Sequence, residues 1–519
     1  MNRVLAALCA SVFAGLIAQT ALAADENPAT DADSVKRHSE KLEPKIPEAK
    51  IFVTQHKGRV GATTMSYTAT AGTMLMKNDK DEPIALFGFT AYVRDGIDSR
   101  TRPIVFAYNG GPGSASAWLH MGILGPKRTD LKDLEFNTRG PFRTVENEFS
   151  ILDTADLVMI DPVGTGISEV IGKGDGKNFW GVDQDVTSVS NFIVQYLSEY
   201  GRWSSPKFIL GESYGGMRTG GVSFALLTKH KVALNGVILV SPYMDVAAGF
   251  AGLRVDEPYV NFLPTFAATA WYHHALTNQP AQLQPFLREV EAFSEDVYAP
   301  ALYKGTRASA AERQKVLEGL ARYTGISADY WDRANLRLDE GKFLQELMRK
   351  QGKVIGRIDS RYASGSIDNL SETMGYDPYD AAISPAIVAT FNDYYRQELK
   401  VKTDREYILS GDLGMHWDDS HQQPGLEGFK SPIANTAVDL AQTMTMNPKM
   451  QILIQQGYFD LAVPYRTIQY VIEHLDVAPE LRGNVHFEYY DAGHMMYVHP
   501  ASMAKFKDTT ADFIRTNTR

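Results

Sequence analysis

A series of short apolar runs, each leading into a turn that contains glycine or proline, constrains this chain more than any other feature. Strands that are buried on both faces read as continuous apolar runs, and they belong to parallel sheets covered by helices on both sides. We therefore expect an α/β fold with a mainly parallel central sheet flanked by helices. The runs lie at 104–108, 157–160, 208–210, 237–240 and 452–454, and another strand pattern follows at 485–490.

The remaining patterns divide the chain into segments. Residues 51–94 carry β-branched and aromatic runs broken by polar turns, as antiparallel strands do. Between about 250 and 440 the strand signals fade, and helical periodicity dominates, as in 309–323 and 341–350. We predict a signal peptide at 1–23, a flexible arm at 24–50, a core in two parts at 51–250 and 441–519, and an inserted, largely helical cap at 251–440.

The N-terminus has the pattern of a signal peptide. Arg3 precedes an apolar stretch at 4–17, and Ala21 and Ala23 provide the small residues that a signal peptidase needs. The stretch is shorter than the roughly 20 apolar residues that span a membrane, so we expect cleavage and export to the periplasm or the medium. The only cysteine, Cys9, lies in this stretch, and the mature protein would therefore have no disulfide and no thiol nucleophile.

Charge and motif content exclude several classes of function. The chain has 52 Lys and Arg against 62 Asp and Glu, a formal net charge of −10, and no basic block of the kind that binds nucleic acid. No later segment is long and apolar enough to span a bilayer, and no motif implies a cofactor. The stretch from His416 to His421 contains two aspartates and is a weak candidate for a metal site, but we interpret it as a polar loop. The oligomeric state stays open.

A serine nucleophile is predicted at residue 213. Residues 211–215 fit G-x-S-x-G and follow a buried strand directly, and a plausible helix comes next at 217–227. In this motif the serine occupies a strained turn between strand and helix, where glycines allow the backbone to approach closely. Its hydroxyl is then exposed at the carboxyl end of the sheet.

The serine needs a base, and the base needs an orienting carboxylate. In α/β hydrolases the chain order is serine, then an acid, then histidine, and Asp460 and His494 each follow a late strand in that order. Asp491 is a rival carboxylate and His499 a rival base, although their positions favour structural roles. We predict a triad of Ser213, Asp460 and His494.

The tetrahedral intermediate of acyl transfer needs two backbone N–H donors. One is expected from Tyr214, the residue after the nucleophile, and the other from the glycine-rich loop at 109–113, with Gly111 as the donor. A phosphate-binding loop is the alternative for these glycines, but no G-K-[ST] follows and the G-x-G-x-x-G spacing is absent.

Four motifs together resemble the serine carboxypeptidases. They are N-G-G-P-G at 109–113, D-P-V-G-T-G-I-S at 161–168, G-E-S-Y-G-G at 211–216 and A-G-H-M at 492–495. The resemblance implies the α/β-hydrolase fold with a helical cap, and binding of the terminal carboxylate of a peptide by Asn109, Gly110 and Glu212. A protonated Glu212 donates a hydrogen bond to that carboxylate, whereas an ionised one repels it, so the resemblance also implies a preference for acid conditions.

The sequence departs from the family pattern at two positions. Ile123 stands where family members usually have a second glutamate, and Ser114 stands where they usually have a cysteine. The first departure leaves the carboxylate clamp incomplete. We therefore predict an exported serine carboxypeptidase acting through an acyl-enzyme, with an esterase or acyltransferase of the same fold as the alternative and a catalytically silent binding protein as a third hypothesis.

Overall fold

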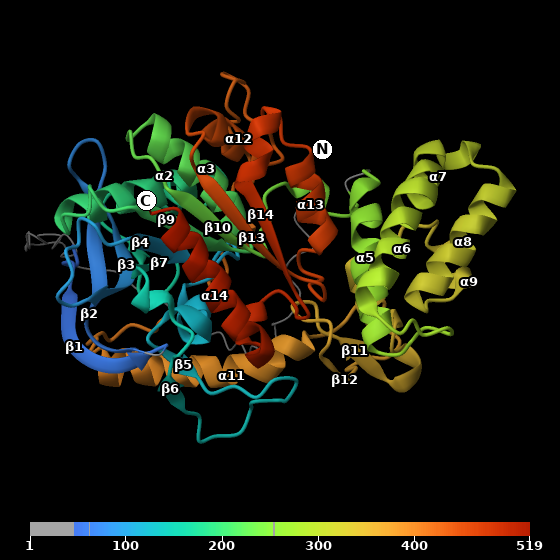
Figure 1. The fold of residues 1–519 in the computed structure, drawn as a ribbon, viewed down its shortest axis with the longest axis horizontal. Helices are drawn as coiled ribbons and strands as arrows, with labels where there is room; N and C mark the ends of the chain where they lie inside the picture. The colour runs from blue at the N-terminus through green and yellow to red at the C-terminus, as the bar shows by residue number, and fades with distance from the viewer. Residues whose placement is uncertain (1–45, 62, 253–254, 519) are drawn as a thin grey trace, which may run out of the picture.

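The computed structural model describes residues 46–61, 63–252 and 255–518 (Figure 1). The predicted signal peptide at 1–23 and most of the predicted arm at 24–50 lie outside the described residues. Among the described residues, no helix has the length and apolar character needed to cross a membrane.

A mixed ten-stranded sheet forms the centre of the molecule, with its main path in the order β1-β2-β3-β7-β4-β9-β10-β13-β14. The N-terminal strands are antiparallel to one another and to β7, whereas all neighbours from β7 to β14 are parallel. The strands of this path are β1 Ile51–Val60, β2 Thr63–Lys77, β3 Pro83–Arg94, β4 Ile104–Tyr108, β7 Asp156–Asp161, β9 Lys207–Glu212, β10 Gly236–Val240, β13 Gln451–Gly457 and β14 Val485–Tyr490. Short strands outside it are β8 Glu169–Val170, which pairs with β3, and the pairs β5 Lys127–Thr129 with β6 Thr144–Glu146 and β11 Lys353–Ile355 with β12 Ala363–Gly365.

Helices cover both faces of the sheet, and each face has its own apolar core. On one face, side chains of α2, α3, α12 and α13 pack against the sheet, among them Phe192 and Leu226. On the other face α11, α14 and the π-helical turn η1 (His120–Leu124) supply Phe391, Phe506 and Leu124. The predicted α/β fold with helices on both sides of the sheet is confirmed. The helices are α1 Ala117–Leu119, α2 Val182–Glu199, α3 Gly215–Thr228, α4 Val246–Gly249, α5 Glu257–Tyr272, α6 Leu283–Phe293, α7 Ala299–Lys304, α8 Ala310–Thr324, α9 Ala328–Arg333, α10 Glu340–Glu346, α11 Pro378–Asp393, α12 Ala437–Met446, α13 Tyr465–Glu473 and α14 Pro500–Thr516.

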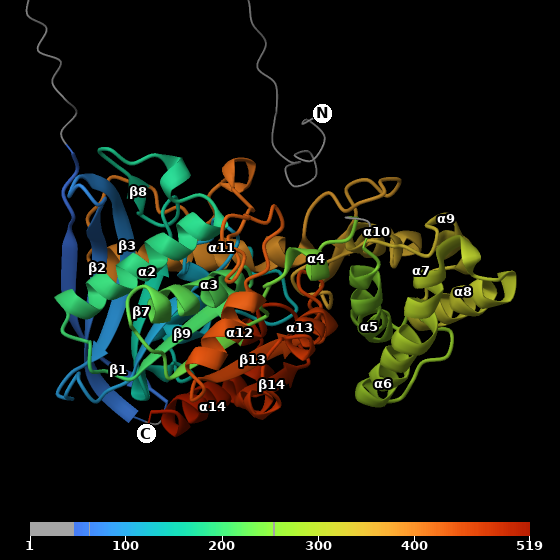
Figure 2. The same ribbon diagram turned by 90° about the horizontal axis from the view of Figure 1, so that it is seen from above.

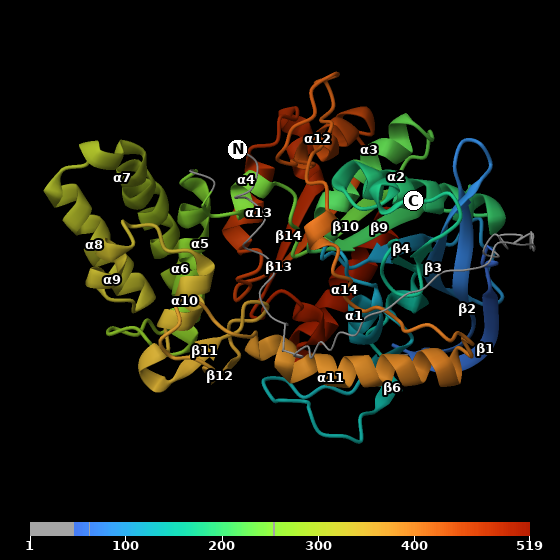
Figure 3. The same ribbon diagram turned by 180° about the vertical axis from the view of Figure 1, so that it is seen from behind.

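The segment between β10 and β13 contains two different parts. Helices α5 to α9 form a lobe beside the sheet, with a core of their own that includes Phe266 and Trp331 (Figure 2). Helix α11 instead runs along the lower side of the main body, near β6 (Figures 1 and 3). The hairpin of β11 and β12 lies where the lobe meets the main body (Figure 1). The cap boundaries at residues 251 and 440 stay a prediction.

The sequence explains the local detail of these helices. Helix α8 begins at a capping box, in which the Ser309 hydroxyl accepts from the Glu312 amide at 3.2 Å and the Glu312 carboxylate accepts from the Ser309 amide at 2.8 Å. It ends at Gly325, whose φ of +69° is the left-handed conformation that glycine adopts at helix ends.

A buried ionic cluster ties the strands together at their amino ends. The Asp156 carboxylate accepts from Arg102 Nε at 2.6 Å and from Arg202 Nη1 at 2.7 Å, and all three side chains are at most 5% exposed. Because Asp156→Ala leaves two buried guanidinium groups unpaired, we expect it to lower the free energy of unfolding by about 3–5 kcal/mol. Urea unfolding followed by circular dichroism measures this loss.

The matched control is Asp512→Ala, whose side chain is 72% exposed in an ion pair with Arg515. An exposed pair contributes about 0–1 kcal/mol. Equal losses in the two variants would contradict the assigned importance of burial.

Candidate active site

Ser213 occupies a sharp turn between β9 and α3. Its φ is +61°, which is unusual for a residue other than glycine and marks a strained backbone. The turn is held by hydrogen bonds of the Ser213 amide to the Val240 carbonyl at 3.0 Å and of the Tyr243 amide to the Ser213 carbonyl at 2.9 Å. A Cβ at Gly211 would lie 2.4 Å from the Gly215 carbonyl oxygen, so this strand-to-helix turn needs glycine at that position.

Asp460 and His494 are hydrogen-bonded to each other although 34 positions separate them in the chain. His494 Nδ1 lies 2.8 Å from Asp460 Oδ2, and the two side chains are 4% and 0% exposed. The other oxygen, Oδ1, accepts from the amides of Ala462 at 2.9 Å and Val463 at 2.8 Å. Gln456 Nε2 donates to Oδ2 at 3.1 Å. Asp460 is therefore fixed in one orientation, with Oδ2 toward the imidazole.

The surroundings of His494 raise its pKa above the ordinary value of 6.5. Burial by itself lowers this pKa, because it disfavours the charged form, but the charge and hydrogen bond of Asp460 raise it. The Glu212 carboxyl also raises it, and the Arg357 guanidinium opposes the rise. The imidazole is thus a stronger base than a free histidine.

The other imidazole nitrogen lies close to the serine turn. His494 Nε2 is 4.0 Å from Oε1 of Glu212, the residue before Ser213. Within the described part of the chain no hydrogen bond joins the Ser213 hydroxyl to the imidazole. Catalytic hydrogen bonds are often long in the absence of substrate and tighten when it binds.

The glycine-rich loop after β4 lies directly against the serine turn. A Cβ at Gly110 would lie 2.4 Å from the Tyr214 amide nitrogen, so the loop backbone approaches as only glycine permits. Gly111 has a φ of +104°, also in the region that favours glycine. Neither the Gly111 amide nor the Tyr214 amide donates a hydrogen bond to another described residue, so both are available to a ligand.

Glu212, Asn109 and Tyr497 form a buried cluster beside the serine. Asn109 Nδ2 donates to Glu212 Oε2 at 2.7 Å, and the Tyr497 hydroxyl donates to Glu212 Oε1 at 2.9 Å. The Tyr497 ring packs on the turn before Ile123, because a Cβ at Gly122 would lie 2.7 Å from it. The Tyr497 hydroxyl therefore contacts Glu212 close to Ile123, the position at which family members usually have a second glutamate.

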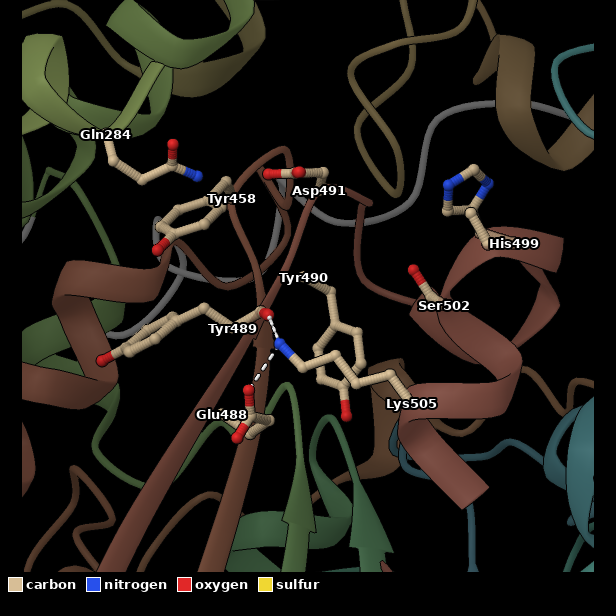
Figure 4. A pocket seen from close by; sticks show the side chains of 10 residues that line it. Gln284, Tyr458, Glu488, Tyr489, Tyr490, Asp491, His499, Ser502 and Lys505 are labelled. Carbon is tan, nitrogen blue, oxygen red and sulfur yellow. Dashed lines mark hydrogen bonds and ion pairs between the residues drawn. The ribbon is translucent and has the colours of Figure 1, made fainter. Parts of the chain in front are cut away.

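The rival residues lie elsewhere. Asp491 and His499 line a cavity of about 420 Å³ beside the end of β14 and the start of α14, together with Tyr458 and Lys505 (Figure 4). Ser213 is not among its lining residues. His499 Nδ1 lies 2.7 Å from Asp133 Oδ2, so this histidine has a carboxylate partner other than Asp460.

His421, in the stretch considered above as a metal site, is paired with two carboxylates. His421 Nδ1 lies 2.6 Å from Asp183 Oδ1, and its Nε2 lies 2.8 Å from Asp439 Oδ2. Burial lowers the pKa of His421, but the hydrogen bonds and charges of the two aspartates raise it to about 9. A protonated imidazole between two carboxylates holds this loop onto α2 and α12. In the described ranges, no group of three or more His, Cys, Asp and Glu is arranged to hold a metal ion.

Sequence reasoning missed several residues that surround this site. Gln456 follows Gln455 at the end of β13, both are fully buried, and such buried polar residues in a strand were an available signal. Tyr497 gave none, because it lies in a 3-10 turn of three residues, Met496–Val498, which is too short to show periodicity. The loop between β11 and β12 also contacts both turns, since the Leu461 amide donates to the Arg357 carbonyl at 3.1 Å and the His494 amide to the Ile358 carbonyl at 2.7 Å.

The fold identifies this chain as an α/β hydrolase, with a serine, a histidine and an aspartate placed after parallel strands at one edge of the sheet. The family model described as serine carboxypeptidase matches residues 64–495. The chain belongs to the serine carboxypeptidase family and is a hydrolase of the serine carboxypeptidase type.

Comparison with one solved carboxypeptidase structure agrees with this fold. The prohormone-processing carboxypeptidase Kex1(delta)p from Saccharomyces cerevisiae is similar with a TM-score of 0.52 at 14% identity, over 87% of this chain and 91% of that one. Proline iminopeptidase from Mycobacterium smegmatis gives a TM-score of 0.37 at 14% identity, over 86% of this chain and 98% of the other. A search of curated protein sequences gives no match.

Proposed function

We propose that this protein is an exported serine carboxypeptidase that removes residues from the C-termini of peptides through an acyl-enzyme on Ser213. The observation that carries the proposal is the buried hydrogen bond of 2.8 Å between His494 Nδ1 and Asp460 Oδ2. This bond orients the His494 imidazole, and its other nitrogen, Nε2, lies near the serine turn. A histidine oriented by a carboxylate in this way is the arrangement that activates a serine hydroxyl.

The proposed reaction has two halves. The Ser213 hydroxyl oxygen attacks the carbonyl carbon of the last peptide bond while His494 Nε2 takes its proton. As the tetrahedral intermediate collapses, the C–N bond breaks and His494 gives the proton to the departing amine, which leaves an ester on Ser213. A water molecule, deprotonated by the same imidazole, then hydrolyses the ester and regenerates the serine.

Gly111 and Tyr214 are the proposed oxyanion donors. Their amides lie in adjoining turns and have no hydrogen-bond partner among the described residues. They are therefore available to donate to the carbonyl oxygen of the substrate, which becomes negatively charged in the tetrahedral intermediate. Donors fixed in advance of the reaction stabilise that charge without reorganisation.

Asn109, Gly110 and Glu212 are the proposed binding residues for the terminal carboxylate, and Tyr497 completes the cluster. The amide of Asn109 and the phenol of Tyr497 each donate to Glu212. When the Glu212 carboxyl is protonated it donates to the substrate carboxylate, while Tyr497 and Asn109 hold it in place. Tyr497 thus supplies a polar contact that Ile123 does not.

A comparison of three substrates tests the proposed function. We expect a blocked dipeptide with a free C-terminus to be hydrolysed with a kcat/KM about 10- to 100-fold above that of its C-terminal amide, because hydrogen bonds to charged groups contribute about 1.5–3 kcal/mol. The third substrate is a simple ester of the same acyl residue, and initial rates measured at several pH values give the comparison.

The same experiment addresses the second candidate, an esterase or acyltransferase on the same serine. Ile123 favours this candidate, since the position lacks the polar group that family members have. Rapid hydrolysis of the ester, with no advantage of the free acid over the amide, would replace the carboxypeptidase proposal by the esterase.

Export rests on the N-terminal sequence. We propose cleavage after residue 23 and release to the periplasm or the medium. N-terminal sequencing of the protein recovered from each cell fraction tests this.

A further inference from the structure

The hairpin loop between β11 and β12 lies across the two turns that carry Asp460 and His494. The Ser360 amide donates to the Phe459 carbonyl at 2.9 Å, on the Asp460 side. On the His494 side, a Cβ at Gly493 would lie 2.5 Å from the Cα of Asp359. The backbone of Arg357 and Ile358 is therefore fixed at the site by contacts with both turns, as described above.

The Arg357 side chain carries a positive charge that is partly exposed to solvent. It is 40% exposed, whereas Asp460 and His494 are almost fully buried. Arg357 Nε donates to Glu340 Oε1 at 2.8 Å, and within the described residues its two terminal nitrogens donate no hydrogen bond. A guanidinium with its terminal N–H groups uncommitted can bind a carboxylate through two parallel hydrogen bonds.

The charge of Arg357 acts on groups at both sides of Ser213. It lowers the pKa of His494, as noted above. Burial raises the pKa of the Tyr243 hydroxyl, and Arg357 lowers that pKa in turn. The geometric link is the backbone: the Arg357 carbonyl accepts from the Leu461 amide at 3.1 Å, one residue after Asp460, and the adjacent Ile358 carbonyl accepts from the His494 amide at 2.7 Å.

We propose that Arg357 is a specificity-determining residue, which binds the acidic side chain of a peptide residue next to the scissile bond. The inference rests on the proposed function for the site itself. The terminal carboxylate has buried partners of its own in Asn109 and Glu212, which are 1% and 5% exposed, so the half-exposed guanidinium is left for a side chain. Glu340 partly neutralises Arg357 and competes with the substrate for it.

Binding in the absence of hydrolysis tests this inference. In a Ser213→Ala background, calorimetric titration compares peptides with free C-termini that carry Glu, Gln or Lys on either side of the scissile bond. We expect Glu at one of the two positions to bind about tenfold more tightly than Gln and Lys to bind more weakly than both. Adding Arg357→Gln should bring the Glu-to-Gln ratio to about one, and Arg357→Lys should retain part of the preference.

Two further variants separate recognition from a structural role. Glu340→Gln keeps an acceptor for Arg357 Nε but removes the competing charge, so we expect the preference for Glu to rise about threefold. Arg333→Gln, in a side chain 66% exposed on α9, should leave all ratios unchanged. Equal affinity for Glu and Gln peptides in the parent, or an equal loss for both in Arg357→Gln, would overturn the inference.

Hydrolysis by the native enzyme distinguishes failure of this inference from failure of the proposed function. If Gln peptides with free C-termini are cleaved but acidic peptides have no advantage in binding, the carboxypeptidase proposal stands and the inference fails. If acidic peptides bind in an Arg357-dependent manner but no peptide is cleaved, the proposed function fails, and of the inference only the recognition of an acidic side chain by Arg357 is retained.

Discussion

The Ser213→Ala variant should lose about 10⁵- to 10⁶-fold in kcat toward peptides, with little change in KM. The hydroxyl oxygen is the atom that forms the acyl bond, and the Ser241 hydroxyl in the neighbouring turn is buried and donates to the His494 carbonyl at 2.8 Å, so it does not replace it. Substrate affinity should persist, since the proposed carboxylate contacts come from Asn109 and Glu212 and need no hydroxyl. Steady-state kinetics on the blocked dipeptide, at enzyme concentrations high enough to measure the residual rate, give both constants.

Covalent labelling and a control variant at another serine show whether the loss is specific to Ser213. A fluorophosphonate should label the native protein and fail to label Ser213→Ala, and unfolding curves should show that both are folded. Ser198→Ala removes an exposed hydroxyl that donates to the Val194 carbonyl at 3.0 Å within α2, and it should retain native kcat. A folded Ser213→Ala variant with nearly native activity would remove the acyl-enzyme from the scheme.

The strands were predictable because a strand buried on both faces has a continuous run of apolar residues in the sequence. The run at 104–108 coincides with β4, and the runs at 208–210 and 237–240 lie inside β9 and β10. The serine turn was predictable because G-x-S-x-G at 211–215, coming directly after an apolar run, is typical of a strand-to-helix turn with the serine at its tip. Parallel strands then bring their carboxyl ends to one edge, which is how sequence order alone placed Asp460 near His494.

The surroundings of the site depend on contacts that leave no local pattern. Tyr497 meets Glu212 across 285 positions of the chain, and Arg357 reaches the site on a hairpin loop between two strands of three residues each. A loop of this kind has no periodicity, and its place is decided by tertiary packing. Sequence reasoning therefore predicted the strands, the candidate triad and candidate binding residues such as Asn109 and Glu212, but not Tyr497 or Arg357, which tertiary contacts bring to the same region.

The Asp460→Asn variant should lower kcat by about 10⁴-fold while leaving the fold intact. The reason lies in how the carboxylate is held. The Ala462 and Val463 amides both donate to Oδ1, so an asparagine at this position must direct its carbonyl oxygen toward them. Its NH₂ group then replaces Oδ2 and faces His494 Nδ1.

An NH₂ group facing Nδ1 requires that nitrogen to accept, which places the imidazole proton on Nε2. In that tautomer Nε2 has no lone pair for the serine proton, so the base is lost even though every atom stays near its native position. The variant thus tests the tautomer of His494 separately from the geometry of the turn.

The pH profile gives a second readout of the same substitution. The base works only when neutral, so native kcat/KM toward the ester, which has no terminal carboxylate for Glu212 to bind, should fall as the pH drops through the pKa of His494, which Asp460 raises. Without that charge, burial and Arg357 lower the pKa against the remaining effect of Glu212, and the acid limb of the residual activity should move to lower pH. Asp491→Asn, at the exposed rival carboxylate, should change neither kcat nor the profile. The opposite outcome, with the large loss in Asp491→Asn and little in Asp460→Asn, would assign the orienting role to Asp491, because only the carboxylate that holds the imidazole can control both its tautomer and its pKa.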